Sequence, residues 1–120
     1  ANLMFAVPAA LSVTDRAAPG QVLGEGVATA GLILTIFALA RTGRAALVAP
    51  AVGAYIGAAY WFTSSTSFAN PAVTIGRIFT DTFAGIAPTS ALWFLAAQVV
   101  GAVVGVGLVF LLFPNRKAQP

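Results

Sequence analysis

The chain contains no cysteine and no histidine, and only three of its 120 residues are acidic. Disulfides, thiol catalysis, the Ser-His-Asp triad and the usual zinc sites each require at least one of the two missing residue types. The three carboxylates that remain do not support covalent catalysis. The sequence therefore predicts no enzyme, no metal site and no cofactor.

Charged residues are scarce and hydrophobic residues are abundant. Charged residues make up 8% of the chain and hydrophobic residues 59%, and the mean hydropathy is +0.93. A soluble domain carries about a quarter of charged residues, so this composition indicates an integral membrane protein. Long apolar stretches predict three spans, at about residues 20–40, 46–63 and 90–113. The expected fold class is all-α, with the lipid bilayer as surroundings.

The basic residues are distributed unevenly about the predicted spans. Those on one side have no acidic neighbour (Arg41, Arg44, Arg116 and Lys117), and those on the other side do (Arg16 beside Asp15, Arg77 near Asp81). The positive-inside rule then predicts that the loop with Arg41 and Arg44 and the C-terminus lie in the cytoplasm. The expected location of this multi-pass protein is the plasma membrane. The net charge of +3 is interpreted as a topology signal. The chain has no stripe of basic residues interleaved with aromatic residues, which is the pattern that would predict nucleic-acid binding.

Residues 68–76 read FANPAVTIG and predict the start of a helix. The Asn70 side chain accepts from the free amides of a first turn, and Pro71 fits the first helical position. We expect the helix to run from Asn70 to about Thr82. About 12 residues span about 18 Å, too short for a hydrocarbon core of about 30 Å. The segment of about 64–82 is therefore predicted to be a re-entrant loop with a half-helix.

The position of this half-helix predicts a pore. Irregular backbone at membrane depth is tolerated where protein covers it or where it lines a water-filled cavity. A half-helix whose N-terminus points to the midplane places positive dipole charge there, which repels cations and protons.

Glu25 is the only carboxylate inside a predicted span, and an ionisable group there is costly enough to be a functional-site candidate. One hypothesis is a structural role, in which Glu25 accepts from the unpaired amides of the irregular 66–69 backbone. The other is a carboxylate that couples transport to protons.

Each predicted span also carries one Gly-x-x-x-Gly motif, formed by Gly20 with Gly24, Gly53 with Gly57, and Gly101 with Gly105. Small residues four apart let helix backbones approach closely in lipid. The motifs therefore predict tight helix packing.

Over essentially its whole length the chain resembles the C-terminal half of the aquaporin, or major intrinsic protein, family. Residues 1–5 are similar to the end of the family's third helix, and Glu25 with Thr29 is similar to part of the fourth. Gly57–Ala58 resembles the pore side of the fifth helix, and Gly101 with Gly105 resembles part of the sixth. Asn70-Pro71-Ala72 with Gly76 is similar to the outer re-entrant loop. The resemblance implies the second half of a six-helix bundle, with residues 1–11 as the tail of a preceding helix. It also implies a homotetramer with one pore per protomer, in which Asn70 donates to the passing solute.

The chain departs from the family pattern at the constriction. The family places an arginine directly after the triplet, where this chain has Val73, and the resemblance puts Ala58 and Ser67 at two further filter positions. These small or apolar residues predict a wide constriction for neutral solutes larger than water, although Phe68 is a candidate to narrow it. Arsenite, by resemblance to bacterial members without this arginine, and glycerol are the expected solutes, beside water. Arg77 is interpreted as an i,i+4 partner of Asp81.

Three spans and one half-helix cannot enclose a pore of this family. The chain is therefore interpreted as a fragment, as one of two complementary chains with an N-terminal half as partner, or as a half-channel that pairs with a second copy. Two other functions stay open: a proton-coupled small antiporter that uses Glu25, and a non-conducting channel subunit.

Overall fold

The computed structural model of the protein describes residues 1–114, which form four α-helices and one short 3₁₀ turn and contain no strand. These elements are α1 (Pro19–Arg41), η1 (Ala45–Leu47), α2 (Val48–Phe62), α3 (Pro71–Arg77) and α4 (Pro88–Leu112). The segments Pro19–Arg41, Ala45–Phe62 and Pro88–Leu112 are long and apolar enough to cross a membrane, with mean hydropathies of 1.9, 1.5 and 2.4. The predicted all-α membrane class is confirmed.

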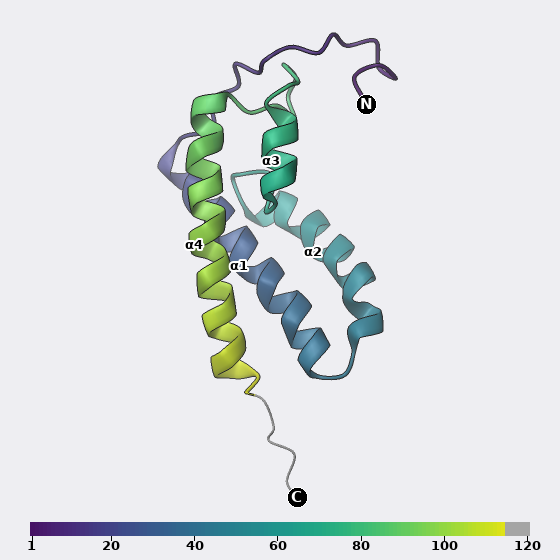
Figure 1. Cartoon of the computed structure of the whole chain (residues 1–120), viewed down its shortest axis with the longest axis vertical. Coiled ribbons are helices and arrows are strands. Elements are labelled where there is room, and N and C mark those ends of the chain that lie inside the picture. Colours follow the sequence, from purple (N-terminus) through teal and green to yellow (C-terminus); the bar gives the residue numbers. More distant parts are fainter. Residues whose placement is uncertain (115–120) are drawn as a thin grey trace, which may run out of the picture.

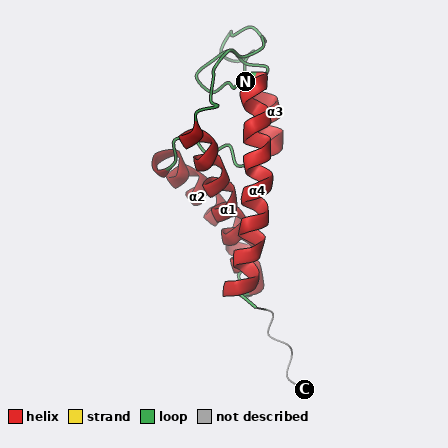
Figure 2. Cartoon of the chain, turned by 90° about the vertical axis from the view of Figure 1, so that its left-hand side faces the viewer, coloured by secondary structure: helices red, strands yellow, loops and turns green. Residues whose placement is uncertain are grey.

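The helices pack around the interface between α1 and α4. Figure 1 shows these two helices crossing side by side, with α2 on the other side of α1 and α3 alongside the upper half of α4. Figure 2, turned by 90°, shows the same pairing of α3 with α4. Within residues 1–114, α3 packs against α4 alone among the helices. The short helix α3 therefore packs against α4 on one side, and no other described helix covers its opposite side.

Two glycines allow the close approach of α4 to α1. A Cβ atom added to Gly101 would collide with the carbonyl oxygen of Gly26, and one added to Gly105 would lie 2.7 Å from the carbonyl oxygen of Ala30. This motif therefore packs as predicted, backbone against backbone.

The other two Gly-x-x-x-Gly motifs behave differently. A Cβ on Gly24 would lie 3.4 Å from the Ser64 amide nitrogen, in the loop after α2. Nothing in the described part of the chain lies within 4 Å of a Cβ on Gly53, Gly57 or Gly76. The prediction of tight packing is therefore wrong for the α2 motif within this chain, because α2 turns that face away from α1.

The residues before α1 form no helix. Residues 2–6 make a turn, where the sequence suggests the tail of a preceding helix over residues 1–11. A stretch this short, with Pro8 near its end, does not sustain a helix by itself. Its assignment to the third helix of the family stays a prediction.

Residues 12–16 run instead along the loop between α3 and α4. The Ser12 amide donates to the Ile78 carbonyl at 2.7 Å, and the Ala87 amide donates to the Thr14 carbonyl at 2.8 Å. The Ala17 amide and the Ser90 hydroxyl both donate to the Asp15 carboxylate and hold its pKa below the usual value. These contacts tie the start of α1 to the start of α4.

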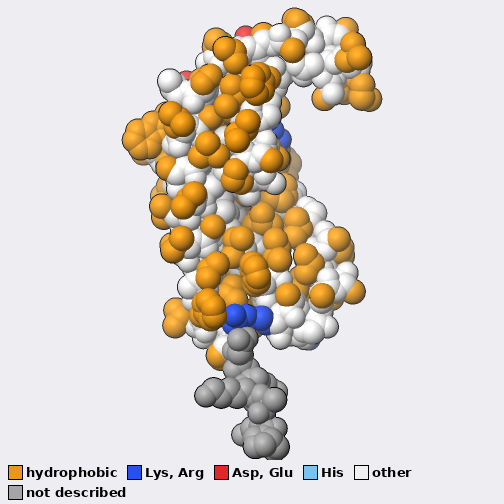
Figure 3. All heavy atoms as spheres, viewed as in Figure 1, with side chains coloured by type: hydrophobic (Ala, Val, Ile, Leu, Met, Phe, Trp, Pro, Cys, Tyr) orange, Lys and Arg blue, Asp and Glu red, His pale blue; other side chains and the backbone are white. Residues whose placement is uncertain are grey.

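Hydrophobic side chains are spread over the whole length of the face drawn in Figure 3, and the charged side chains visible there lie toward its two ends. This distribution suits a chain surrounded by lipid. Arg41, at the end of α1, donates to the Phe113 carbonyl at 2.7 Å and lies 4.6 Å from the Phe110 ring centroid. The predicted orientation depends in part on Arg116 and Lys117, which lie outside the described residues, and it stays a prediction.

Candidate functional site

The helix α3 begins where the sequence predicts. Asn70 has extended backbone angles, and its Oδ1 accepts from the amides of Ala72 at 2.8 Å and Val73 at 3.3 Å. Pro71 occupies the first helical position, where no amide hydrogen is needed. Because Oδ1 accepts the capping hydrogen bonds, the side-chain Nδ2 remains available as a donor. Within residues 1–114 it donates no hydrogen bond. Asn70 is exposed.

The end of α3 differs from the prediction. The helix stops at Arg77 after seven residues, not near Thr82, and covers about 10 Å. The carbonyls that would continue it have other partners: the Arg77 carbonyl accepts from the Ile86 amide at 3.2 Å, and the Ile78 carbonyl accepts from Ser12. Contacts with distant segments therefore end the helix early.

The interpretation of Arg77 as a partner of Asp81 is wrong. The two residues are not on one helix, and Asp81 accepts instead from the Val13 amide at 3.2 Å. The Arg77 guanidinium lies 4.3 Å from the centroid of the Phe68 ring, and its Nη1 has no hydrogen-bond partner among the described residues.

A second arginine faces the same ring. The Arg16 guanidinium lies 5.4 Å from the Phe68 centroid, and it donates to the carbonyls of Gly85 and Phe83 at 2.8 and 2.5 Å. Burial lowers the pKa of Arg16, and the nearby charge of Arg77 adds to this effect. Two cations thus share the aromatic ring as a common neighbour.

The backbone that leads into Asn70 is strained. Thr66, Ser67 and Ala69 have φ values of 62°, 45° and 46°, a left-handed region that residues other than glycine rarely adopt. Each such residue costs about 1–3 kcal/mol, and the conformation persists only where the surrounding structure holds it. This segment therefore needs anchors.

Glu25 is one anchor, through the contact that the sequence predicts for a structural role. Its carboxylate is fully buried and accepts from the Phe68 amide at 3.2 Å and from the Ala69 amide. Both carboxylate oxygens are occupied, and Thr29 donates to the Glu25 carbonyl one turn later.

Gln98 is a functional candidate that the sequence reasoning missed. It is 2% exposed in α4, and its Nε2 lies 2.8 Å from Glu25 Oε1 and 2.7 Å from Thr74 Oγ1. The signal was present, because Gln98 is the only polar side chain between Ser90 and the end of α4. A polar residue in such a span is costly unless it has a partner.

The predicted pore residues divide into two groups. Asn70, Pro71, Ala72 and Ala58 are exposed, and Val73 is half-buried against a hydrophobic cluster formed by Phe68, Ile86, Ala91 and Phe94. These five residues remain candidates for the pore wall, and Gly76 lies open one turn along α3.

Ser67 and Phe68 are placed differently from the sequence expectation. Each is 3% exposed. The Phe68 ring lies edge-on to Phe94, with 5.3 Å between centroids, and the Ser67 hydroxyl donates to the Ile56 carbonyl at 3.4 Å. The reason is the left-handed backbone at Thr66, Ser67 and Ala69, which turns both side chains toward this chain's own core. Phe68 therefore does not narrow an open face.

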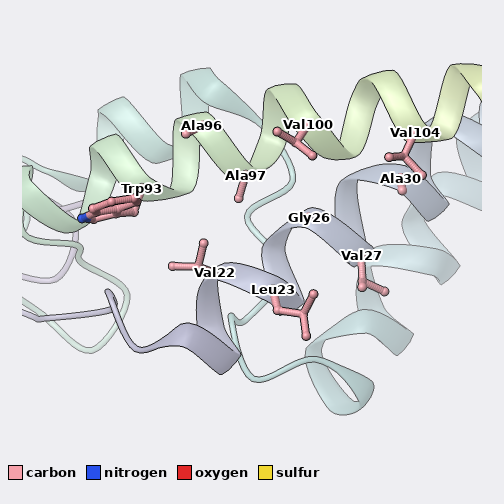
Figure 4. A pocket seen from close by; sticks show the side chains of 10 residues that line it. All are labelled: Val22, Leu23, Gly26, Val27, Ala30, Trp93, Ala96, Ala97, Val100 and Val104. Carbon is pink, nitrogen blue, oxygen red and sulfur yellow. The ribbon is translucent and has the colours of Figure 1, made fainter.

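Several grooves flank these elements, and two of them bear on the solute path. One, of about 460 Å³, lies between the end of α2 and the re-entrant segment and is lined by Gly57, Tyr60, Trp61, Thr66 and Phe83. The other, also of about 460 Å³, runs between α1 and α4 from Trp93 to Val104, as Figure 4 shows. Alkyl groups and one indole ring line the second groove, so it offers a polar solute almost no hydrogen bonds, and the solute path is not expected there.

These features define a class of protein: an all-α membrane protein with three apolar helices long enough to span and a short, side-chain-capped helix between the second and third of them. The comparisons place it further. The family model described as "Major intrinsic protein" matches residues 46–120, and the chain belongs to this family. The family is one of channels and not of enzymes, which agrees with the prediction of no enzyme.

The chain is also similar to the protein named "Aquaglyceroporin AqpS" of Rhizobium meliloti (strain 1021). The two are 51% identical over 118 residues, which cover 97% of this chain and 50% of the relative. The chain thus spans about half the length of the curated relative that it matches. No solved structure matches the chain.

Proposed function

We propose that this chain forms one half of a passive channel for small neutral solutes in the plasma membrane. The observation that carries the proposal is the exposed Asn70 at the start of a half-helix that α4 holds on one side and that is open on the other. The other half of the pore is supplied by an N-terminal half or a second copy, and the complete channel is a homotetramer. The relative supports this division, because the chain covers half of its length.

The proposed role of Asn70 follows from its hydrogen bonds. The helix amides hold Oδ1, so Nδ2 is the group that faces outward from the open side. It donates to the hydroxyl or water oxygen of a passing solute. The positive end of α3 lies at the same place and disfavours cations.

The proposed solutes are larger than water. Val73 and Ala58 offer no fixed cation and little bulk, and neither Ser67 nor Phe68 lies on the open face. Glycerol is the first candidate, since the relative is named an aquaglyceroporin. Arsenite, neutral at pH 7, is the second, on the basis of the missing arginine alone.

Val73→Arg is expected to reduce glycerol flux through the complete channel more than water flux. A guanidinium at this position narrows the constriction and adds a fixed charge. Stopped-flow swelling of proteoliposomes measures both fluxes, and Val73→Leu, which adds volume without charge, is the control. An unchanged ratio of glycerol to water flux in Val73→Arg would show that Val73 does not line the constriction.

Asn70→Asp is expected to fold and to leak cations. A carboxylate keeps the acceptor of the helix cap, so stability is retained, but it replaces the amide donor by a negative charge at the positive end of α3. Conductance of the complete channel in planar bilayers measures the leak, with Thr80→Asp in the loop after α3 as the control. If Asn70→Asp stays as cation-tight as the unmodified channel, Asn70 is a helix cap only.

The geometry of Glu25 favours a channel over a proton-coupled antiporter. Its carboxylate is fully buried and already accepts from two backbone amides and from Gln98. A carrier must expose and titrate its carboxylate during each cycle. Flux that disappears when a proton gradient is collapsed would favour the antiporter, and no flux in any pairing would favour a non-conducting subunit.

A further inference from the structure

Gln98 lies at the centre of a buried network that joins three helices. Its Nε2 contacts Glu25 in α1 and Thr74 in α3 at 2.8 and 2.7 Å. All three side chains are at most 2% exposed. The amide nitrogen carries two hydrogens, so Gln98 is the donor in both contacts, one hydrogen to each.

The next hydrogen bond has a fixed direction. Thr74 Oγ1 lies 3.0 Å from the carbonyl oxygen of Asn70, and that oxygen can only accept. Since Thr74 already accepts from Gln98, its single hydrogen is donated to Asn70. Donation thus passes from Gln98 through the Thr74 hydroxyl to the Asn70 carbonyl.

Glu25 fixes the orientation of the Gln98 side-chain amide, with Nε2 rather than Oε1 facing the carboxylate. A flipped amide would place Oε1 against a carboxylate oxygen and would remove the hydrogen that Thr74 accepts. In the orientation observed, Oε1 is buried and has no partner among the described residues. An unpaired buried acceptor is costly, so the orientation is set by the two donated bonds and not by the needs of the oxygen.

We propose that Gln98 is a positioning residue for the pore amide of Asn70. Glu25 holds the backbone just before Asn70, at Phe68 and Ala69, and Thr74 holds the Asn70 carbonyl itself. Gln98 joins these two anchors, so it fixes the peptide from which the Asn70 side chain projects. The inference rests on the proposed function, in which Nδ2 of Asn70 donates to the solute.

The test uses the complete channel and three variants. Gln98→Leu keeps the volume and removes both donors. Thr74→Val keeps the shape and removes the hydroxyl, whereas Thr74→Ser keeps the hydroxyl and is the matched control. We expect glycerol flux per folded channel to fall about fivefold in Gln98→Leu and in Thr74→Val, the effect of one lost hydrogen bond on a barrier. Thr74→Ser stays near the unmodified flux.

The double variant separates positioning from packing. If Gln98 acts through Thr74, Gln98→Leu combined with Thr74→Val has the same flux as either single change, because both break one path. Independent packing defects would multiply and give about a 25-fold loss, which would overturn the proposal.

A second measurement keeps the test independent of transport. In the isotope-labelled channel, the side-chain amide resonances of Asn70 are expected to shift in Thr74→Val and Gln98→Leu and to stay in place in Thr74→Ser. Unmoved resonances in Thr74→Val would refute the positioning role, even if Gln98→Leu fails to fold. An unmodified channel without flux would refute the proposed function, while the resonances would still decide the positioning role.

Discussion

Replacing Glu25 with alanine is expected to cause the largest loss of stability in this chain. The change leaves the Phe68 and Ala69 amides and one hydrogen of Gln98 without an acceptor in a fully buried place. Each buried group without a partner costs about 1–3 kcal/mol. The strained backbone over residues 66–69 would lose its main anchor at the same time. The thermal unfolding midpoint in detergent, together with the yield of folded protein, measures the effect.

Asp81→Ala is the matched control for Glu25→Ala. Asp81 also accepts from a backbone amide, that of Val13, but it is exposed, so water replaces the lost acceptor. A change at such a surface site stays within about 0.5 kcal/mol. Equal midpoints for Glu25→Ala and the unmodified chain would mean that another group holds the re-entrant backbone.

Gly101→Ala is expected to separate α1 from α4. The new Cβ would collide with the carbonyl oxygen of Gly26, which is backbone and cannot turn aside. Overpacking of this kind costs about 1–3 kcal/mol, and here it opens the main helix interface of the chain. The thermal midpoint is expected to fall, and a cross-link between cysteines introduced at Ala30 and Val104 is expected to form more slowly.

Gly107→Ala tests the same substitution further along α4, on a different face and without the collision. No described atom lies within 4 Å of a Cβ on Gly107, and alanine is the better helix former by up to about 1 kcal/mol. The two alanine variants are therefore expected to change the midpoint in opposite directions. A matching change in both would show that close approach at Gly101 does not limit stability.

The structure explains how a helix of only about two turns is held in place. The helix α3 has only seven residues and packs on α4 alone among the described helices. Its stability comes from groups outside it: the cap by Asn70, the carboxylate of Glu25 before it, and the Gln98 amide behind it. Polar contacts inside the bundle thus supply the stability that a helix of this length lacks by itself.

The sequence predicted the start of α3 but neither its end nor the placement of its flanking residues. The Asn70–Pro71 pair acts within one turn, so the start is visible locally. The end depends on Ser12 and Ile86, which take the carbonyls of Ile78 and Arg77 from distant points in the chain. The burial of Phe68 depends in turn on three neighbouring residues in the left-handed conformation. None of them is a glycine, so the sequence does not indicate this conformation.

By itself, the sequence determined the membrane class, the number of spans, the capped start of the half-helix and the need of the irregular backbone for a buried acceptor. These follow from hydropathy, from the Asn-Pro pair and from the cost of an unpaired carboxylate, all of which act over a few residues. Only the tertiary structure decided which glycines pack, which way Phe68 and Ser67 turn, and that Gln98 joins Glu25 to Thr74. Those contacts join residues up to 75 positions apart, as with Gly101 and Gly26, and their geometry exists only once α1, α3 and α4 have packed together.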